Sequence, residues 1–310
     1  MTYNFITADN GVGLSRDMKI FADALDLKKD IDWFFCDYHS HKKPPKRDIN
    51  VYFELVDSMY FDTADFHILV PNPEWYLPRW TKLLDRFDLV LCKTHHAVEV
   101  FKPYVGGKAI FVGFTSDDRF LNVQKDYTLP ACFMGKSMTK GAKPVYDACV
   151  LHDKPLLLLS NKLNEKWIKS VGQVVTYRGR LEDDDFMKIQ NTQGIHVCCS
   201  DYEGFGHYIN EAKSTGAVII TTNYPPMNEI CSEDFAFFVR AKPNRKQGLV
   251  QTCIVDSVDF IRVYNEVVNT DPETLKEMGE KARRSFLIND KGFKARMKKL
   301  KKKINLHFGN

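Results

Sequence analysis

The sequence alternates short apolar runs with amphipathic stretches along most of its length. Residues 17–27, 78–86 and 95–101 carry apolar side chains at helical spacing. Strands that alternate with helices predict βαβ units and a mostly parallel sheet with helices on both faces. The apolar runs of strand length in the first part of the chain are 3–7, 32–36, 49–54, 66–70, 89–92 and 108–112.

The same alternation begins again after a polar stretch at 117–130. A helix is expected at 143–151, and further strands at 131–134, 156–160, 173–177, 196–199 and 217–221. A chain of 310 residues is long enough for two domains, and we place their boundary near Asp126. We therefore expect two α/β domains, 1–126 and 127–290, followed by a basic C-terminal helix at 291–310.

Composition and cysteine usage narrow the class of protein. Hydrophobic residues make up 44% of the chain, which supplies a sizeable core and argues against disorder. The eight cysteines form no Cys-x-x-Cys pair and lie in or beside apolar runs, so we expect buried free thiols in a reducing compartment. The chain lacks a signal-peptide pattern, and no apolar run approaches the roughly 20 residues of a membrane helix. We expect a cytoplasmic protein, at most peripheral on the cytosolic membrane face.

The most informative segment follows the apolar run at 196–199. It reads Ser-Asp-Tyr-Glu-Gly-Phe-Gly-His from Ser200 to His207 and continues to Glu211. Gly204 and Gly206 let the backbone approach a ligand, and the helix that follows, which Gly216 is expected to end, points unpaired N–H groups at that ligand. A pyrophosphate suits such a site, and a carboxylate can accept hydrogen bonds from neighbouring sugar hydroxyls.

This segment resembles the donor-binding motif of retaining GT-B glycosyltransferases, particularly glycosyltransferase family 4. The residues that match in identity and order are Ser200, Glu203, Gly204, Phe205, Gly206, Glu211, Ala212 and Gly216. The resemblance implies that Glu203 lies near the sugar and the phosphates and that Glu211 contacts the ribose, with Phe205 and His207 also at the donor site. It also implies the GT-B fold, in which two Rossmann-like parallel-sheet domains face each other across a cleft.

Two more segments extend the resemblance. The family often has Gly-Arg and then Lys-Gly at the start of the second domain, where the basic residues neutralise the donor pyrophosphate. Here Gly135 is followed by Lys136, which keeps the charge of the arginine but loses its bidentate fork, and Lys140 matches the family lysine. With Glu203, Lys136 and Lys140 are the candidate catalytic residues.

A third segment follows the expected strand at 217–221. Glu229 matches a family glutamate, and Asn228 precedes it. Pro225 and Pro226 stand where the family has flexible glycines, which leaves open whether the backbone contacts the donor there.

Over the first domain the resemblance rests on architecture alone. Gly11 and Gly13 lie between the first strand and the first helix, where a ligand loop and a plain tight turn are both open readings. A dehydrogenase fingerprint would need a third glycine. The candidate acceptor or cleft residues follow two expected strands, where a structural turn is the alternative, and they are Asn72, Glu74, Lys93 and Thr94.

We expect a glycosyltransferase that moves a sugar from a nucleotide-sugar donor to a glycan, glycolipid or glycoprotein hydroxyl. The resemblance implies retention of the anomeric configuration. We expect no metal ion and no bound cofactor, because residues 183–185 read as a helix N-terminus rather than a metal motif. The alternatives are a sugar-nucleotide epimerase on the same fold and a nucleotide-sugar binding protein that has lost catalysis.

The basic segment between Lys291 and Lys303 contains eight lysines and arginines and no acid. It suits a solvated helix that crosses back to the first domain, a contact with anionic lipid, or nucleic acid. We favour the crossing helix and expect no nucleic-acid partner, because the net charge of the whole chain is only +4.

Overall fold

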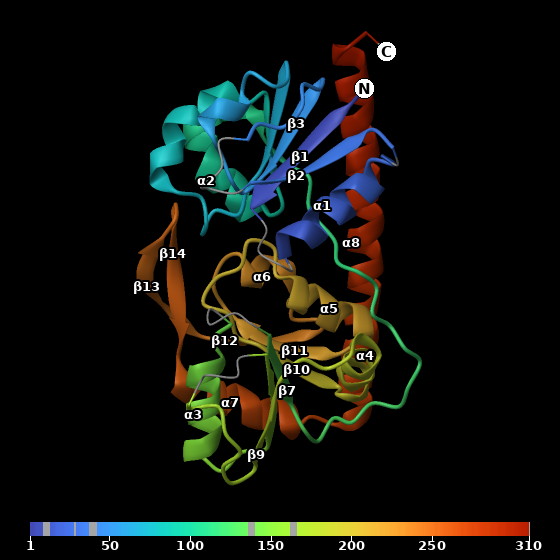
Figure 1. The fold of residues 1–310 in the computed structure, drawn as a ribbon. Coiled ribbons are helices and arrows are strands. Elements are labelled where there is room, and N and C mark those ends of the chain that lie inside the picture. The colour runs from blue at the N-terminus through green and yellow to red at the C-terminus, as the bar shows by residue number, and fades with distance from the viewer. Residues whose placement is uncertain (9–12, 28, 37–41, 136–139, 162–165, 310) are drawn as a thin grey trace. The chain divides into compact units, whose positions relative to one another are not determined.

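The structure, a computed structural model, describes all residues except 9–12, 28, 37–41, 136–139, 162–165 and 310. The chain divides into two compact units. The first comprises Met1–Thr115, Lys246–Val250 and Asn289–Asn310, and the second comprises Ser116–Arg245 and Gln251–Ile288. Each unit contains one six-stranded sheet, and every pairing within the two sheets is parallel (Figure 1). The α/β class with two parallel sheets is thereby confirmed.

The first sheet has the strand order β2-β1-β3-β4-β5-β6. Its strands are β1 (Tyr3–Ala8), β2 (Ile31–Cys36), β3 (Ile49–Phe53), β4 (Phe66–Val70), β5 (Leu89–Cys92) and β6 (Ala109–Phe111). The helices are α1 (Gly13–Ala24), α2 (His95–Val105) and three 3-10 helices, η1 (Ser58–Tyr60), η2 (Pro78–Arg86) and η3 (Gly106–Lys108). Every residue of β3, β4 and β5 is buried, as expected of a sheet that is covered on both faces.

The second sheet has the order β12-β11-β10-β7-β8-β9. Its strands are β7 (Ala131–Gly135), β8 (Leu156–Ser160), β9 (Val174–Arg178), β10 (Ile195–Cys198), β11 (Val218–Thr222) and β12 (Ala236–Val239). The chain runs outward from β7 through β8 to β9, then returns and runs the other way from β10, so the strand order reverses between β7 and β10. Such a reversal is the point where doubly wound sheets bind their ligands.

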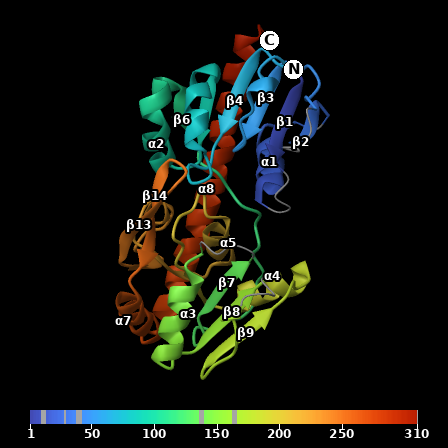
Figure 2. The same cartoon turned by 60° about the vertical axis from the view of Figure 1, so that its left-hand side comes forward.

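Five helices surround the second sheet, and they are α3 (Ala142–Leu151), α4 (Asp183–Thr192), α5 (His207–Thr215), α6 (Met227–Ile230) and α7 (Ser257–Val268). α3 and α7 pack on one face, while α4 and α5 lie on the other (Figure 2). The expected helix start at Asp183 is confirmed, since three acids occupy the first turn of α4, where they favour the positive end of the helix dipole.

The expected strands agree with the observed ones to within one or two residues, but the helices of the first unit differ more. α1 begins at Gly13 rather than at residue 17, because its buried stripe already starts at Leu14. It ends at Ala24 because Asp26 adopts a left-handed conformation with φ 51°. Residues 78–86 form a 3-10 helix rather than an α-helix.

The boundary between the units lies at Thr115–Ser116, eleven residues before the expected position near Asp126. The residues after Thr115 already bond to the second unit. The Arg119 backbone N–H donates to Ser214 Oγ at 3.1 Å, and the Leu121 N–H donates to Asn191 Oδ1 at 2.8 Å. Composition marks the polar stretch but does not say which unit it bonds to.

The last helix, α8 (Pro272–His307), is a single element of 36 residues. The expected separate helix at 291–310 is therefore the last part of one continuous helix that begins at Pro272. Its residues from Asn289 onward group with the first unit. Phe293 packs on Phe114 with ring centroids 5.1 Å apart, and Arg296 Nε donates to the Val112 carbonyl at 2.6 Å.

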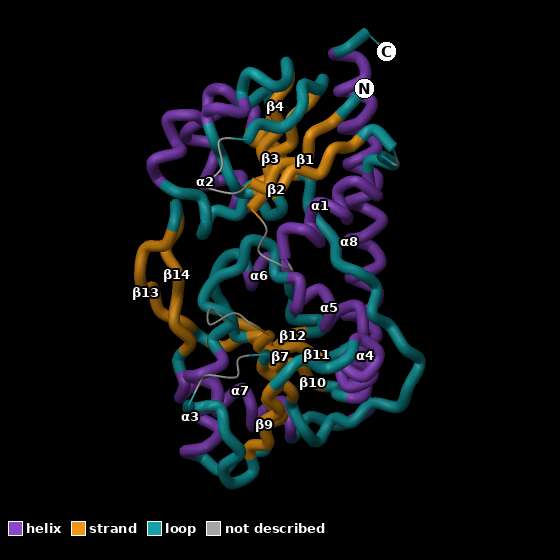
Figure 3. Tube along the Cα trace, viewed as in Figure 1, coloured by secondary structure: helices purple, strands orange, loops and turns teal. Residues whose placement is uncertain are grey.

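The strands β13 (Ala241–Gln247) and β14 (Val250–Val255) form a two-stranded sheet of their own (Figure 3). The sequence pattern does not predict this sheet, because β13 is largely polar and contains Pro243. Its two-residue turn belongs to the first unit. Gly248 there has φ +56°, and a Cβ atom would lie 2.4 Å from the Pro73 carbonyl oxygen.

All eight cysteines are free thiols, and all except Cys36 are buried, as expected. Burial raises the pKa of Cys132 and of Cys231 to about 12, so both remain protonated. Among the described residues, no helix combines the length and the apolar character needed to cross a bilayer.

Candidate functional site

The candidate site lies at the carboxyl end of the second sheet, where the strand order reverses. The loop after β7 carries Lys140 and Gly141, and the loop after β10 carries Ser200 to Gly206. β7 and β10 are direct neighbours, with His196 opposite Ala131, so their two loops leave the sheet side by side.

Lys140 and Glu203 form an ion pair in this site. Lys140 Nζ lies 2.9 Å from Glu203 Oε1 and 3.5 Å from the centroid of the Tyr208 ring. Ser200 Oγ donates to the same carboxylate oxygen at 2.5 Å and is also hydrogen-bonded to the Tyr208 hydroxyl. The side chains of Lys140 and Glu203 are 17% and 12% exposed. Two of the three predicted catalytic residues are thus in contact and accessible from solvent.

Gly141 explains why the lysine is followed by glycine in this loop. Its φ is +60°, and a Cβ atom would lie 1.6 Å from the Cys199 carbonyl oxygen. No side chain can be accommodated so close to a backbone atom. The absence of one lets the backbone at Gly141 lie directly against the end of β10, with the preceding residue, Lys140, beside Glu203.

The N-terminus of α5 forms a third part of the site. Gly206, which has no side chain to cap the helix, precedes it with φ +80°. Gly216 ends the helix with φ +72°, as expected. His207, the first helical residue, has Nδ1 2.8 Å from Ser116 Oγ and packs edge-on against Phe205. Gly204 is buried in the same turn. The helix dipole adds partial positive charge here.

Glu211 lies one turn further along α5. Its side chain is 8% exposed and accepts a hydrogen bond from Gln190 Nε2 at 3.0 Å, while Arg119 Nε donates to Gln190 Oε1 at 2.8 Å. This chain of contacts fixes the carboxylate against α4. The assignment of Glu211 to a ribose stays a prediction.

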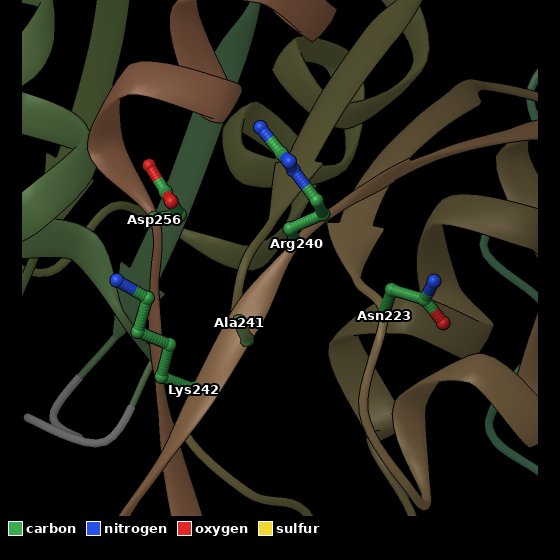
Figure 4. Close-up of a pocket in the computed structure, with 5 residues that line it drawn as sticks. All are labelled: Asn223, Arg240, Ala241, Lys242 and Asp256. Carbon is green, nitrogen blue, oxygen red and sulfur yellow. The ribbon is translucent and has the colours of Figure 1, made fainter.

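Asn228 and Glu229 lie on the short helix α6 beyond β11. Asn228 Nδ2 donates to Asn223 Oδ1 at 3.1 Å, and Glu229 is exposed. A pocket of about 300 Å³ opens nearby, beyond the ends of β11 and β12 (Figure 4). Its lining residues are Asn223, Arg240, Ala241, Lys242 and Asp256. None of the predicted site residues is among them.

Asp201 is a member of the site that the sequence did not assign. Burial raises the pKa of this carboxyl from 3.8 to about 6, the charge of Arg245 lowers it, and the charge of Glu203 raises it. Arg245 lies on β13, outside every motif, so only its position in the fold connects it with Asp201.

The carboxyl end of the first sheet holds a separate, buried polar network. Lys93 forms an ion pair with Asp17 and donates a 3.0 Å hydrogen bond to Asn72 Oδ1. Asn72 Nδ2 donates to Glu54 Oε2 at 2.8 Å. Burial raises the pKa of Glu54, while Asn72 and Lys93 lower it and Asp17 raises it. Asp17 and Glu54 were missed, although Glu54 is an acid within a largely apolar segment.

The other residues predicted in the first unit have varied surroundings. Thr94 is the N-cap of α2 and accepts a 3.0 Å hydrogen bond from the Ala97 N–H, which gives it a structural role. Glu74 is buried, and Gly13 is the first residue of α1. In the second unit, Gly135 ends β7 with φ +60° and open space where its Cβ would be. Gly11 and Lys136 lie outside the described residues.

Residues 160–285 match the family described as Glycosyl transferases group 1. No curated protein matches the chain significantly in sequence. Among solved structures, sucrose-phosphate synthase from Thermosynechococcus elongatus aligns with a TM-score of 0.72 at 11% identity, over 99% of this chain and 100% of that chain. Anabaena HepE in complex with UDP and glucose aligns with a TM-score of 0.68 at 12% identity, over 97% and 98%.

A third structure, the GtfA/B complex, aligns with a TM-score of 0.62 at 12% identity over 84% of this chain, which spans 58% of the matched chain. The two parallel sheets and these alignments define a GT-B fold. The chain shares this fold with glycosyltransferases of known structure along nearly its whole length. The residues that match the glycosyl transferases group 1 model include β10 and the Ser200–Gly206 loop.

Proposed function

We propose that this protein transfers a sugar from a nucleoside-diphosphate sugar to an acceptor hydroxyl, with the donor bound by the second unit. One observation carries the proposal. Lys140 and Glu203, 63 residues apart in sequence, meet where the strand order reverses, and the motif that supplies Glu203 continues into the N-terminus of α5. Cationic charge and a helix N-terminus suit a diphosphate, and an adjacent carboxylate suits sugar hydroxyls.

The chemistry of sugar transfer explains why these groups are needed. As the glycosyl bond breaks, positive charge builds on the sugar ring and negative charge on the leaving diphosphate. Lys140 and the start of α5 stabilise that negative charge from fixed positions. Glu203, paired with Lys140 in this structure, accepts hydrogen bonds from the donor when Lys140 turns to the phosphates.

We further propose retention of the anomeric configuration, on the strength of the motif from Ser200 to Gly216. The acceptor attacks on the face of the leaving group, and a donor phosphate oxygen takes its proton. No metal ion and no bound cofactor take part in this proposal. The measurement that tests retention is the NMR coupling constant of the anomeric proton in the product.

A thermal-shift screen tests donor binding. The panel contains UDP-, GDP- and ADP-sugars with the free diphosphates, and UDP compounds come first because HepE was crystallised with UDP. A donor at a hundredfold excess over its dissociation constant stabilises the fold by about 2.7 kcal/mol. We expect Glu211→Ala to abolish the shift and Glu233→Ala, which removes an exposed acid, to preserve it.

The outcomes separate the candidate functions. Release of diphosphate and formation of a glycosylated acceptor support transfer. Conversion of one nucleotide sugar into another without an acceptor supports the epimerase, and binding without any turnover supports a protein that has lost catalysis. No shift with any donor overturns the proposed donor site.

We also propose that the outer face of α8 contacts anionic lipid, which places the enzyme near a membrane-bound acceptor. Phe293, Met297, Leu300 and Ile304 form the buried stripe of this part of the helix. The exposed lysines on the other side are Lys291, Lys294, Lys298, Lys299, Lys302 and Lys303. Each lysine close to an anionic surface contributes about 1 kcal/mol.

Vesicle sedimentation tests this contact. We expect binding to vesicles that contain phosphatidylglycerol and none to phosphatidylcholine alone. Replacing Lys298, Lys299 and Lys302 with Gln removes about 3 kcal/mol, which corresponds to a loss of about 100-fold. The matched control replaces three exposed lysines outside α8, Lys102, Lys169 and Lys188, with Gln. Equal binding by the two triple variants would overturn the proposal.

A further inference from the structure

We propose that Arg245, which the β13–β14 hairpin brings to the donor site, is a further cationic ligand of the donor diphosphate. This inference rests on the proposed function and adds a residue from outside the motif. It concerns the second unit only, to which Lys140, Asp201, Glu203 and Arg245 all belong.

The hairpin is anchored directly to the motif. The Cys253 N–H donates to the Asp201 carbonyl at 2.9 Å, and Cys253 Sγ donates to the same oxygen at 3.1 Å. On the adjacent residue, Thr252 Oγ1 donates to the Arg245 carbonyl at 3.1 Å. These bonds connect residue 245 to residue 201 through one strand, so the position of Arg245 is set by the backbone of the site.

The charge of Arg245 acts on Asp201, which lies in the same motif as Glu203. It lowers the pKa of Asp201, and Glu203 raises that same pKa, so both charges lie close to one carboxylate. A Cβ atom on Gly141, the residue after Lys140, would be 3.5 Å from Asp201 Oδ1. Two cations and two acids thus form one cluster, whose charges balance in this structure.

Several features make Arg245 a ligand rather than a packing residue. Its side chain is exposed, whereas Asp201 and Glu203 are half-buried. A diphosphate brings at least two negative charges to a cluster whose cations are already matched by acids, so binding requires cations that can leave their partners. A guanidinium group binds phosphate oxygens in a bidentate manner, which a lysine cannot do.

The test compares UDP, GDP and ADP with the corresponding monophosphates by calorimetry, using the wild type, Arg245→Gln and Lys246→Gln. Lys246 is the neighbouring exposed residue on β13 and loses the same charge, but side chains of adjacent strand residues point to opposite faces. We expect Arg245→Gln to weaken diphosphate binding about 10- to 100-fold and monophosphate binding less. Lys246→Gln should bind like the wild type, and Arg245→Lys should show an intermediate loss.

A double variant separates a phosphate ligand from a group that only neutralises Asp201. If Arg245 contacts the diphosphate, Asp201→Asn/Arg245→Gln remains weak. If Arg245 only masks the carboxylate, the double variant regains wild-type affinity, which would overturn the inference. If the wild type binds the diphosphates and Arg245→Gln binds them equally well, the inference about Arg245 is overturned and the proposed function stands. No diphosphate binding by the wild type would overturn both.

Discussion

The carboxyl ends of the two sheets carry the same kind of ion pair in different surroundings. In the first unit, the side chains of Lys93 and Asp17 are 2% and 5% exposed. In the second unit, those of Lys140 and Glu203 are 17% and 12% exposed. Both lysines lie over an aromatic ring, Lys93 at 4.8 Å from the centroid of Phe114 and Lys140 at 3.5 Å from that of Tyr208.

The difference lies in what else holds each lysine. Lys93 follows directly on a buried strand and is also bonded to Asn72, which in turn bonds Glu54. Lys140 directly precedes Gly141, whose backbone lies against the Cys199 carbonyl. A buried charge pair is costly to break, whereas a pair that meets solvent can exchange partners with a ligand. The Lys93–Asp17 pair therefore stabilises the first unit, and the Lys140–Glu203 pair suits ligand binding.

The largest effect is expected from Lys93→Ala. It leaves the Asp17 carboxylate buried without its cation, which costs about 3–5 kcal/mol of unfolding free energy. Denaturant titration measures the loss. In the control, Asp17→Leu/Lys93→Met, both charges are replaced by apolar groups of similar size, and most of the stability should return. A loss from Lys93→Ala of less than about 1 kcal/mol would contradict the stabilising role.

Lys140→Ala should lower activity much more than stability, whereas Lys93→Ala mainly lowers stability. We expect kcat/KM for sugar transfer to fall at least 100-fold, equivalent to about 2.7 kcal/mol of transition-state stabilisation. Lys140 is more buried than its loop position suggested, so a stability loss of about 1 kcal/mol accompanies the effect. Lys143→Ala, which removes a half-exposed lysine on α3, is the control. Equal rates in the two variants would exclude Lys140 from the mechanism.

Ser200→Ala tests whether the Lys140–Glu203 site depends on the hydrogen bonds that the Ser200 hydroxyl makes. The serine is fully buried, and its hydroxyl is bonded to both Glu203 and Tyr208. Its removal leaves the Tyr208 hydroxyl without this partner, which costs about 1–2 kcal/mol. Thermal unfolding measures the cost, and the less buried Ser232→Ala is the control. A change no larger than that of the control would mean that the hydroxyl contributes nothing measurable.

The smallest effect is a pH dependence that arises from Asp201. Its pKa is raised from 3.8 to about 6 in the folded state, so between these values the folded protein binds the proton more tightly than the unfolded chain. Stability from this group is present below pH 4 and is lost as the pH rises through 6. Because Asp201 is only half-buried, the effect is on the order of 1 kcal/mol after allowance for solvent screening.

Asp201→Asn checks this sign. The variant should be more stable than the wild type at pH 7.5, and the difference should vanish near pH 4, as measured by unfolding midpoints across that range. A variant that is less stable at pH 7.5 would show that the attraction between Asp201 and Arg245 outweighs the cost of burial.

The sequence by itself determined the strands of both sheets except β12, and it singled out the segment from Ser200 to Gly216. Apolar runs of strand length report burial locally, and each run that became β4, β5 or β8 has the predicted bounds. The ends of α5 were also predictable, because Gly206 and Gly216 adopt positive φ angles that favour glycine.

Tertiary structure alone decided which charges meet. The Lys140–Glu203 pair spans 63 residues and the Lys93–Asp17 pair spans 76, and no periodicity encodes either contact. The β13–β14 hairpin could not be predicted from the sequence, because its first strand is polar. The unit boundary depended on hydrogen bonds to Ser214 and Asn191. Local patterns fix which face of an element is buried, whereas the partners of its polar groups depend on strand order and on where distant loops leave the sheet.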